Sequence, residues 1–329
     1  MNKVPVFSIL TPSWNRGHLL PRVYQSLLTQ EFQNFEWILS DDGSTDDTEK
    51  LAHNFLSDDH LAIQYVRSDR RVGKARLDNE AIKTCKGQLV LWCDSDDVLL
   101  PNALKDLMEV WASIPDLDKQ NYSGLTGLAL TANGPTLDPF PGCENFETTW
   151  NELFGAHTRG AKNQDMVLCA RSDLLKRHLF PEVDFVVPEG VVWTRLGNLK
   201  TKLISKPMKF VEYGHVGAIS HTDKMEYNRG RAFSIAQVYS EMNKFDPSFL
   251  SFMKNTIKFF RYAFHGEINH QKAIEIWNAK NFNIFQYMAI AISLLFVVRD
   301  KMVKNVVRTH REFEKNNRVA VITRKNNNG

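Results

Sequence analysis

The feature that most constrains this chain is residues 89–101, an apolar run that passes into closely spaced aspartates. Residues 89–93 are all apolar, Asp94 follows at once, and Asp96 and Asp97 come within the next three positions. A continuous apolar run after a turn-forming Lys-Gly pair is typical of a fully buried strand in a parallel sheet. The sequence therefore predicts an α/β fold in which one strand ends in a group of carboxylates.

Carboxylates gathered at the end of one strand repel one another and lose hydration unless a cation lies among them. Hard oxygen ligands favour Mg²⁺ or Mn²⁺, and these ions complete their shells with water and substrate phosphates. In open α/β sheets, ligands bind at the carboxyl ends of the strands. The alternative is that the Asp-Ser-Asp-Asp run is a turn that caps the next helix.

Strand-like and helical patterns alternate through the first third of the chain. Strands are predicted at residues 4–10, 36–40, 63–66 and 89–93, and helices at 19–28, 51–56, 75–84 and 101–112. Residues 11–17 are expected to form the loop above the first strand, and Asp46 or Asp47 to cap the second helix. This alternation is typical of a parallel sheet with right-handed crossovers.

Two of the predicted loops carry groups that suit a nucleotide. The backbone amides and hydroxyl near Thr11 and Pro12 can approach a base and a ribose closely. A carboxylate at Asp41 or Asp42 can accept a hydrogen bond from a pyrimidine N3–H, which favours uracil over purines. The alternative is that Asp42 begins a plain turn followed by a helix cap.

Lys74 and Arg76 lie at the start of a predicted helix, beside a glycine. Cations and backbone N–H groups at a helix start can face a diphosphate. The alternative is that both side chains lie in solvent.

Four motifs, in their order and spacing, resemble the large inverting family-2 glycosyltransferases with a GT-A fold. They are SILTPSWNR (8–16), LSDDGSTD (39–46), GKARLDN (73–79) and DSDD (94–97). The resemblance is strong over residues 4–105, weaker over 106–222 and close to absent after that. It implies an α/β GT-A (Rossmann-like) fold, with a mostly parallel sheet flanked by helices and a helical C-terminal extension.

The resemblance also assigns site residues. The uridine of a UDP-sugar would contact the first two motifs, through Thr11, Pro12, Asn15, Arg16, Asp41 and Asp42. Lys74, Arg76 and Asn79 would face the diphosphate, although the commonest family form has Ala-Arg-Asn where this chain has a longer Gly-Lys variant. Asp96 would bind Mn²⁺ or Mg²⁺. Asp94 would contact the ribose or belong to the metal shell, with Ser95 beside it. Asp97 would cap the next helix or orient its neighbours. A divalent ion bridging the diphosphate neutralises charge as the glycosidic bond breaks.

The length of 329 residues allows one large α/β domain plus an appendage. We expect a nucleotide-sugar-binding half over residues 1–105, an acceptor-binding and catalytic half over 106–222, and a helical region over 223–329. Strand-like runs occur at residues 125–131, 166–170, 202–204 and 208–212, a short helix is predicted at 172–178, and residues 232–242 and 249–264 have helical spacing.

The general base is predicted in the acceptor half. Resembling enzymes carry a Glu-Asp pair before a helix that contains an aromatic residue, and the matching place here is Glu189-Gly190, so the second carboxylate is missing. An inverting transfer needs one carboxylate to take the proton of the attacking hydroxyl. Glu189 is the candidate, with Asp184, Asp165 and Glu182 in reserve. The alternative is that Glu189 is a helix-start carboxylate stabilised by the helix dipole.

The C-terminal region combines an uncharged segment with a basic one. Residues 281–298 contain no charged side chain, but their apolar core, 287–298, is too short for a confident transmembrane span. Nine Lys and Arg against three Asp and Glu follow in the last 31 residues. This pattern favours interfacial attachment to an anionic cytoplasmic leaflet. The alternative is a buried helix or a dimer contact.

Composition narrows the remaining classes. The net charge of +3 is too small to indicate a nucleic-acid partner. Four scattered cysteines without a Cys-x-x-Cys motif fit reduced thiols in the cytosol, and the N-terminal apolar run breaks too early for a signal peptide. We therefore expect a cytoplasmic enzyme at the inner face of the membrane that transfers sugar from a nucleotide sugar to a glycan or lipid-linked saccharide in cell-surface polysaccharide biosynthesis. The alternatives are a non-catalytic sugar-nucleotide-binding subunit and a nucleotidyltransferase. The second is disfavoured because the glycine loop does not follow the first strand.

Overall fold

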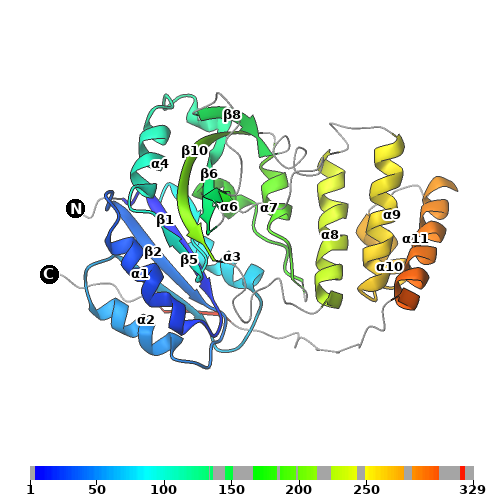
Figure 1. Cartoon of the computed structure of the whole chain (residues 1–329), viewed down its shortest axis with the longest axis horizontal. Coiled ribbons are helices and arrows are strands. Elements are labelled where there is room, and N and C mark those ends of the chain that lie inside the picture. The colour runs from blue at the N-terminus through cyan, green and yellow to red at the C-terminus, as the bar shows by residue number, and fades with distance from the viewer. Residues whose placement is uncertain are drawn as a thin grey trace. The chain divides into compact units, whose positions relative to one another are not determined.

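The computed structural model describes residues 4–132, 134–135, 145–150, 166–183, 186–197, 199–212, 224–242, 249–277, 284–303 and 319–322 (Figure 1). The chain divides into two compact units. The first comprises Met1–Leu179, Leu196–His215 and Asn316–Gly329, and the second comprises Phe180–Arg195 and Val216–Lys315.

The first unit is built on one sheet flanked by helices. Its strands are β1 (Phe7–Ser13), β2 (Phe35–Asp41), β3 (Ile63–Ser68), β4 (Leu89–Trp92), β5 (Asp97–Leu99), β6 (Tyr122–Thr131), β7 (Gly134–Pro135), β8 (Asn145–Thr149), β9 (Met166–Arg171), β10 (Lys200–Val211) and β11 (Val319–Ile322). Its helices are α1 (Leu20–Leu28), α2 (Thr48–Ser57), α3 (Lys74–Thr84), α4 (Ala103–Ala112) and α6 (Ser172–Arg177), with short 3-10 turns at Gly17–Leu19 and Lys119–Asn121. The main path of the sheet is β11-β3-β2-β1-β4-β9-β6-β10-β5, with β7 paired to β6 and β8 to β10.

The expected parallel sheet is present in strands β3, β2, β1 and β4. Ile9 of β1 lies in register with Trp37 of β2 on one side and Leu91 of β4 on the other, both in parallel pairs. These strands are buried along almost their whole length, which is the pattern expected of a sheet covered by helices on both faces.

Alternate side chains of the parallel strands serve two cores. Ile9 and Trp37 pack in a cluster with residues of α1, α2 and α4, whereas their neighbours Leu10 and Ile38 lie outside that cluster. Buried residues of α3 such as Leu77 are also outside it. The period of two along each strand therefore places α1, α2 and α4 on one face and α3 on the other.

A buried carboxylate ties the amino-terminal edge of these strands together. Glu36 Oε1 accepts from the Ser8 hydroxyl at 2.6 Å and from the Lys86 backbone N–H at 2.6 Å, and Glu36 Oε2 accepts from Gln64 Nε2 at 2.6 Å. Satisfied polar groups of this kind fix the relative positions of buried strands. Glu36 lies at the opposite edge from the acidic turn.

The strand β1 extends further than expected. Residues 11–17 were expected to form a loop, but Thr11, Pro12 and Ser13 belong to β1 and pair with Leu39, Ser40 and Asp41 of β2. Pro12 has no N–H to donate. Next to it, the Ser13 carbonyl accepts from the Asp42 N–H at 2.9 Å, which closes the pairing with β2.

Beyond β4 the sheet is mixed, whereas the sequence predicted a mostly parallel one. The strand β9 is antiparallel to both β4 and β6, and only β6 and β10 form a further parallel pair. A parallel pair needs a long crossover, usually helical. The sequence between α4 and β9 carries few helical patterns, and antiparallel pairing results.

Three other expectations need correction. The runs at 202–204 and 208–212 were expected as two strands, but residues 200–211 form one strand, β10, whose register shifts on both sides of Pro207. Pro207 cannot donate to the ladder and such residues are found at irregularities. Asp97 was expected to cap the next helix or to orient its neighbours. It begins the short strand β5 and is not the cap, because α4 starts later than predicted, at Ala103. The strand β11, antiparallel to β3, lies within residues 223–329, which were expected to form a helical region.

The second unit is helical, with α7 (Gly190–Arg195), α8 (Lys224–Met242), α9 (Phe249–His265), α10 (His270–Trp277) and α11 (Ile284–Val303). Figure 1 shows α8, α9 and α11 side by side, and α9 contacts both of the others. Phe259, Phe260 and Trp277 form the centre of its core. This confirms helices in the C-terminal region. The expected boundaries at residues 105 and 222 stay a prediction.

Within the described helices, none combines the length and the hydropathy that crossing a bilayer requires.

Gly124→Ala tests the packing of β6 against β9. The added Cβ would lie 2.0 Å from the Cys169 carbonyl oxygen, in the middle of the sheet, so the strands must move apart. We expect the free energy of unfolding to fall by about 2 kcal/mol or more in a urea titration.

Gly190→Ala is the matched control, because a Cβ at Gly190 meets no atom within 4 Å. It should leave the urea midpoint almost unchanged. Equal midpoints for the two variants would contradict the close approach of β6 and β9.

Candidate active site

The loops after β1 and β2 are hydrogen-bonded to each other at the carboxyl edge of the parallel strands. The Asn15 N–H donates to Ser44 Oγ at 2.8 Å, and the Thr45 N–H donates to Asn15 Oδ1 at 2.8 Å. The Gly17 N–H donates to Asp46 Oδ2 at 2.9 Å. Asn15 has a φ of +52°, a conformation that asparagine tolerates well. The side-chain oxygen of Asn15, a residue predicted to contact the nucleotide, therefore accepts a hydrogen bond from the neighbouring loop.

Asp41 and Asp42, the two candidates for contacting the base, are both buried and both accept hydrogen bonds. Asp41 is 0% exposed, and its Oδ2 accepts from the Tyr65 hydroxyl at 2.6 Å. Asp42 is 6% exposed, and its Oδ1 accepts from the N–H groups of Val72 at 2.6 Å and Gly73 at 3.1 Å. Burial raises the pKa of Asp42 to about 6, against the effect of those N–H groups. Of the two, Asp42 is the less enclosed.

Gly43 allows the loop after β2 to approach the loop after β3. It has a φ of +69°, and a Cβ there would lie 2.3 Å from the Arg70 carbonyl carbon. A side chain would therefore push apart the two loops that Asp42 connects. Asp41-Asp42-Gly43 is thus a structural bridge between loops as well as a candidate contact for a base.

The acidic turn after β4 presents two of its carboxylates and buries the third. Asp94 and Asp96 are partly exposed, whereas Ser95 and Asp97 are 2% and 3% exposed. The two aspartates that the resemblance assigns to ribose and metal are therefore the accessible ones. A bound ion or diphosphate at this edge would meet Asp94 and Asp96 first.

Arg16 of the loop after β1 reaches across to this turn. Its Nη1 donates to Asp96 Oδ2 at 2.6 Å and to Ser95 Oγ at 3.4 Å. Both side chains of the ion pair are largely covered, at 14% and 19% exposed. The structure thus places Arg16, predicted to contact nucleotide, directly on the predicted metal ligand.

Asp97 is paired with Lys209, a residue that the sequence did not single out. Lys209 Nζ lies 2.5 Å from Asp97 Oδ2, and both side chains are buried. Burial raises the pKa of Asp97 to about 7, although Lys209 opposes the rise and Asp94 adds to it. Burial disfavours the charge of Lys209, but Asp97 and Asp94 raise its pKa above the usual range. The only local signal was a lysine between two apolar residues of a strand.

The start of α3 contributes one engaged cation and one available one. Lys74 Nζ pairs with Asp78 Oδ2 at 2.9 Å, one helical turn along. Arg76 is partly exposed, and its guanidinium makes no hydrogen bond or ion pair with the described part of the chain. Asn79 is 1% exposed. Of the three residues predicted to face a diphosphate, Arg76 is therefore the one whose positive charge is not in an ion pair with the described part of the chain.

The first motif is partly structural. The Thr11 hydroxyl is buried and accepts from Trp37 Nε1 at 3.0 Å, and its predicted contact with a base or ribose stays a prediction. Pro12 is partly exposed beside it. Trp14, which sequence analysis did not assign, lies under Arg71, whose Cζ is 3.7 Å from the indole centroid. This stack joins the loops after β1 and β3.

The donor set at the acidic turn fits a hard divalent ion with few protein ligands. Mg²⁺ and Mn²⁺ are bound through one or two carboxylates plus substrate phosphates, and Asp94 and Asp96 supply two accessible ones. Among the described residues, no group of three or more His, Cys, Asp or Glu is arranged to hold a metal. An ion at Asp96 would have to share that carboxylate with Arg16.

Glu189 lies in the second unit, immediately before α7. It is partly exposed, and its carbonyl accepts from the Val192 N–H at 2.9 Å, which makes it a helix-start residue. Glu182 is exposed, whereas Asp165 and Asp184 lie outside the described residues. The assignment of the general base to Glu189 stays a prediction.

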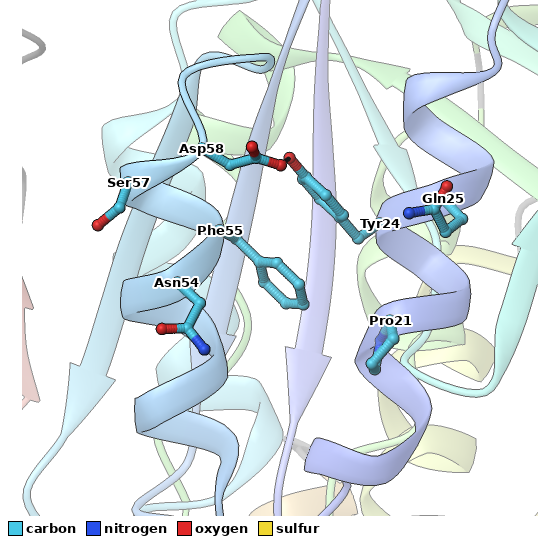
Figure 2. Close-up of a pocket in the computed structure, with 7 residues that line it drawn as sticks. All are labelled: Pro21, Tyr24, Gln25, Asn54, Phe55, Ser57 and Asp58. Carbon is cyan, nitrogen blue, oxygen red and sulfur yellow. Dashed lines mark hydrogen bonds between the residues drawn. The ribbon is translucent and has the colours of Figure 1, made fainter.

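A shallow groove of about 500 Å³ lies between α1 and α2, away from these loops. Figure 2 shows Tyr24 and Asp58 meeting across it, and the Tyr24 hydroxyl donates to Asp58 Oδ2. Its floor is the stacked pair of Tyr24 and Phe55, with ring centroids 4.5 Å apart. Ser57 is the last residue of α2 and Asp58 follows it, at the end of the helix opposite the loops at the carboxyl ends of the strands. We regard this groove as a packing feature.

A comparison with protein families identifies the segment from β1 to α4. Residues 8–118 match the profile described as glycosyl transferase family 2. Residues 8–118 belong to glycosyl transferase family 2. The family 2 segment runs from β1 to the end of α4 and contains all four motifs around which the site is built.

Curated relatives of the family 2 segment are named as glycosyltransferases. It is 33% identical over 106 residues to a GalNAc(5)-diNAcBac-PP-undecaprenol beta-1,3-glucosyltransferase of Campylobacter jejuni, covering 32% of this chain and 34% of that protein. It is 35% identical over 104 residues to the putative colanic acid biosynthesis glycosyl transferase WcaA of Escherichia coli K12, covering 32% and 37%. The match thus spans about a third of each relative.

Solved structures are similar over most of the chain. One is Staphylococcus aureus TarS 1-349 in complex with UDP-GlcNAc, with a TM-score of 0.58 at 18% sequence identity. The similarity covers 89% of this chain and 80% of the TarS chain. Mannosyltransferase PcManGT of Pyrobaculum calidifontis, in complex with GDP-Man and Mn²⁺, has a TM-score of 0.50 at 16% identity, with coverage of 82% and 92%. At these identities the likeness concerns the fold, and it confirms the expected GT-A class.

Lys209→Met tests the ion pair behind the acidic turn. It leaves the Asp97 carboxylate buried beside Asp94 and Asp96 without its cation. We expect the free energy of unfolding at neutral pH to fall by about 3 kcal/mol or more. Adding Asp97→Asn should restore part of the loss, because the amide carries no charge.

Lys206→Met, in the same strand, is the control. Lys206 pairs with Asp106 at 2.7 Å but is 65% exposed. Its loss should change the free energy of unfolding by less than about 1 kcal/mol. Equal losses of unfolding free energy for the two lysine variants would contradict a larger contribution from the buried ion pair.

Proposed function

We propose that this protein is an inverting glycosyltransferase that moves a sugar from a UDP-sugar to a hydroxyl of a saccharide or lipid-linked saccharide in cell-surface polysaccharide biosynthesis. The observation that carries the proposal is the accessible pair Asp94 and Asp96 at the carboxyl edge of a family 2 segment. Polysaccharide biosynthesis is supported by the colanic acid relative.

Asp96 and Asp94 are proposed to hold a divalent ion, Mn²⁺ or Mg²⁺, against the donor diphosphate. Such an ion would neutralise the charge that develops on the leaving diphosphate. The similar fold of PcManGT was solved with GDP-Man and Mn²⁺, which supports a metal of this kind. Arg76 is proposed to add a second positive charge, which is supported by the absence of a hydrogen-bond or ion-pair partner for it in the described part of the chain.

Asp42 is proposed to contact the base of the donor. Asp42 is buried but keeps 6% of its surface exposed, whereas Asp41 is 0% exposed and bonded to Tyr65. A carboxylate that accepts from N3–H favours uracil. The complex of TarS 1-349 with UDP-GlcNAc supports a uridine donor for this fold.

Glu189 is proposed to remove the proton from the acceptor hydroxyl. The hydroxyl oxygen then forms a bond to the anomeric carbon while the bond from that carbon to the diphosphate oxygen breaks on the opposite face. The configuration at the anomeric carbon is therefore inverted. Substrates with a lower-pKa hydroxyl should depend less on this residue.

The acceptor and location are proposed together. A relative whose name contains PP-undecaprenol supports a lipid-linked saccharide as one acceptor class. Such an acceptor is presented at a membrane surface, so we place the reaction at the cytoplasmic face of the cell membrane, with peripheral contact by the protein.

One sequence feature keeps a second function in view. Gly190 stands where resembling enzymes have the second carboxylate of a Glu-Asp pair. A chain without a working base would bind a sugar nucleotide as a non-catalytic subunit. Donor binding without any turnover, unchanged in Glu189→Gln, would support that function.

Release of UDP from a panel of UDP-sugars in the presence of Mn²⁺ tests the proposal. We expect slow hydrolysis of one donor by the wild type and at least about a hundredfold less with Asp96→Ala, because charge on the leaving group is no longer neutralised. Asp116→Ala, which removes an aspartate that is 92% exposed, should retain wild-type hydrolysis.

Transfer to a saccharide acceptor then tests the base. Glu189→Gln should keep donor affinity while losing at least about a hundredfold in transfer rate, and Glu182→Gln should keep both. The opposite ranking would move the base to Glu182. Absence of binding and turnover with every nucleotide sugar and metal would refute the proposed function.

A further inference from the structure

The helix α11 is apolar on two opposite faces. One face packs on α9, where Ala289, Ile290 and Val297 are buried and the Ser293 hydroxyl donates to the Ile257 carbonyl at 3.0 Å. A helix that rests on its unit through one stripe normally carries polar residues on the other. In α11 the opposite stripe is also apolar.

This second stripe, called here the outer face of α11, is exposed over most of the helix. Its residues are Ile284, Tyr287, Met288, Leu294, Leu295 and Val298, with exposed fractions from 46% to 71%. Their spacing of three, four and seven positions places them along one side of the helix. At the same end as Ile284, Phe249 of α9 is 57% exposed and packs edge-on against Phe285, with ring centroids 4.9 Å apart.

The sequence around the outer face of α11 separates apolar from charged residues. Residues 281–298 have no charged side chain. Residues 299–315, which continue the second unit after this segment, hold six Lys and Arg against three Asp and Glu. An uncharged apolar face is thus followed directly in sequence by a stretch with an excess of positive charge.

We propose that the outer face of α11 is a docking surface for an anionic lipid bilayer. The helix would lie in the interface plane, with its apolar side chains among the acyl chains nearest the headgroups and Tyr287 at the headgroup level. The basic residues that follow would gain from the negative surface potential of the leaflet.

Two other occupants fit less well. A second copy of α11 would cover the apolar face but would give no partner to the basic residues that follow it. The chain's own residues 304–318 offer only three large apolar side chains, Val306, Val307 and Phe313, against six on the outer face. A bilayer with anionic headgroups satisfies both the apolar face and the charge.

The inference extends the membrane contact in the proposed function by naming the surface and the headgroup charge. It rests on that function only for the biological setting, because vesicle binding needs neither donor nor acceptor. A failure to bind vesicles would therefore leave sugar transfer untouched, and a failure of sugar transfer would leave vesicle binding untouched.

Co-sedimentation of the full chain with vesicles tests the proposal. Wild type should bind vesicles of equal parts phosphatidylglycerol and phosphatidylcholine, bind phosphatidylcholine alone at least about tenfold more weakly, and lose affinity as salt is raised. The double variant Met288→Glu with Leu295→Glu should bind the mixed vesicles at least about tenfold more weakly, because two charges would enter the apolar layer.

Leu117→Glu is the matched control, since Leu117 is an isolated leucine of the first unit that is 85% exposed. It should bind vesicles like the wild type. Thermal melting checks that the double variant is folded, and the comparison of the two vesicle types needs no variant at all.

Two results would overturn the proposal. One is equal binding of the wild type to both vesicle types, or of the wild type and the double variant to mixed vesicles. The other is a wild-type dimer in sedimentation velocity that becomes a monomer in the double variant while neither binds vesicles, because a second copy would then occupy the outer face.

Discussion

The site depends on the neutralisation of the carboxylates gathered after β4. Burying Asp97 beside Asp94 and Asp96 is unfavourable unless cations are brought to the same turn. Lys209 from β10 supplies one at 2.5 Å, and Arg16 from the loop after β1 supplies another at 2.6 Å. These two contacts hold the acidic turn against β10 and against the loop after β1. Asp94 and Asp96 are thereby held partly exposed, where a further cation and a diphosphate can reach them.

The same arrangement explains which parts of the site could be predicted. The apolar run of β4 and the aspartates after it are adjacent in sequence, so both the buried strand and the acidic edge followed from local pattern. Lys209 is 112 positions from Asp97, and no local pattern identifies its partner. Asp41 was predicted as a candidate base contact because its type and position suit that role. Its burial against Tyr65 depends on how β2 and β3 pair.

The fold shows a similar division. The parallel pairing among β1, β2, β3 and β4 was implied by the alternation of strands and helices, although their order in the sheet was not predicted. The antiparallel strand β9 and the strand β11 depend on long-range pairing, and β11 is only four residues long, Val319–Ile322, between polar residues. The apolar character of α11 was visible in sequence. Which of its two apolar faces is exposed became clear only from its packing on α9.

The central claim is that Asp94 and Asp96 form the metal and diphosphate site of a family 2 enzyme. Diffraction data collected at the manganese edge, from crystals grown with UDP and Mn²⁺, test it most directly. The account predicts an anomalous peak in contact with the Asp96 carboxylate and the diphosphate, with the uracil beside Asp42. A nucleotide bound elsewhere, for example in the groove between α1 and α2, or a metal remote from Asp96, would contradict it.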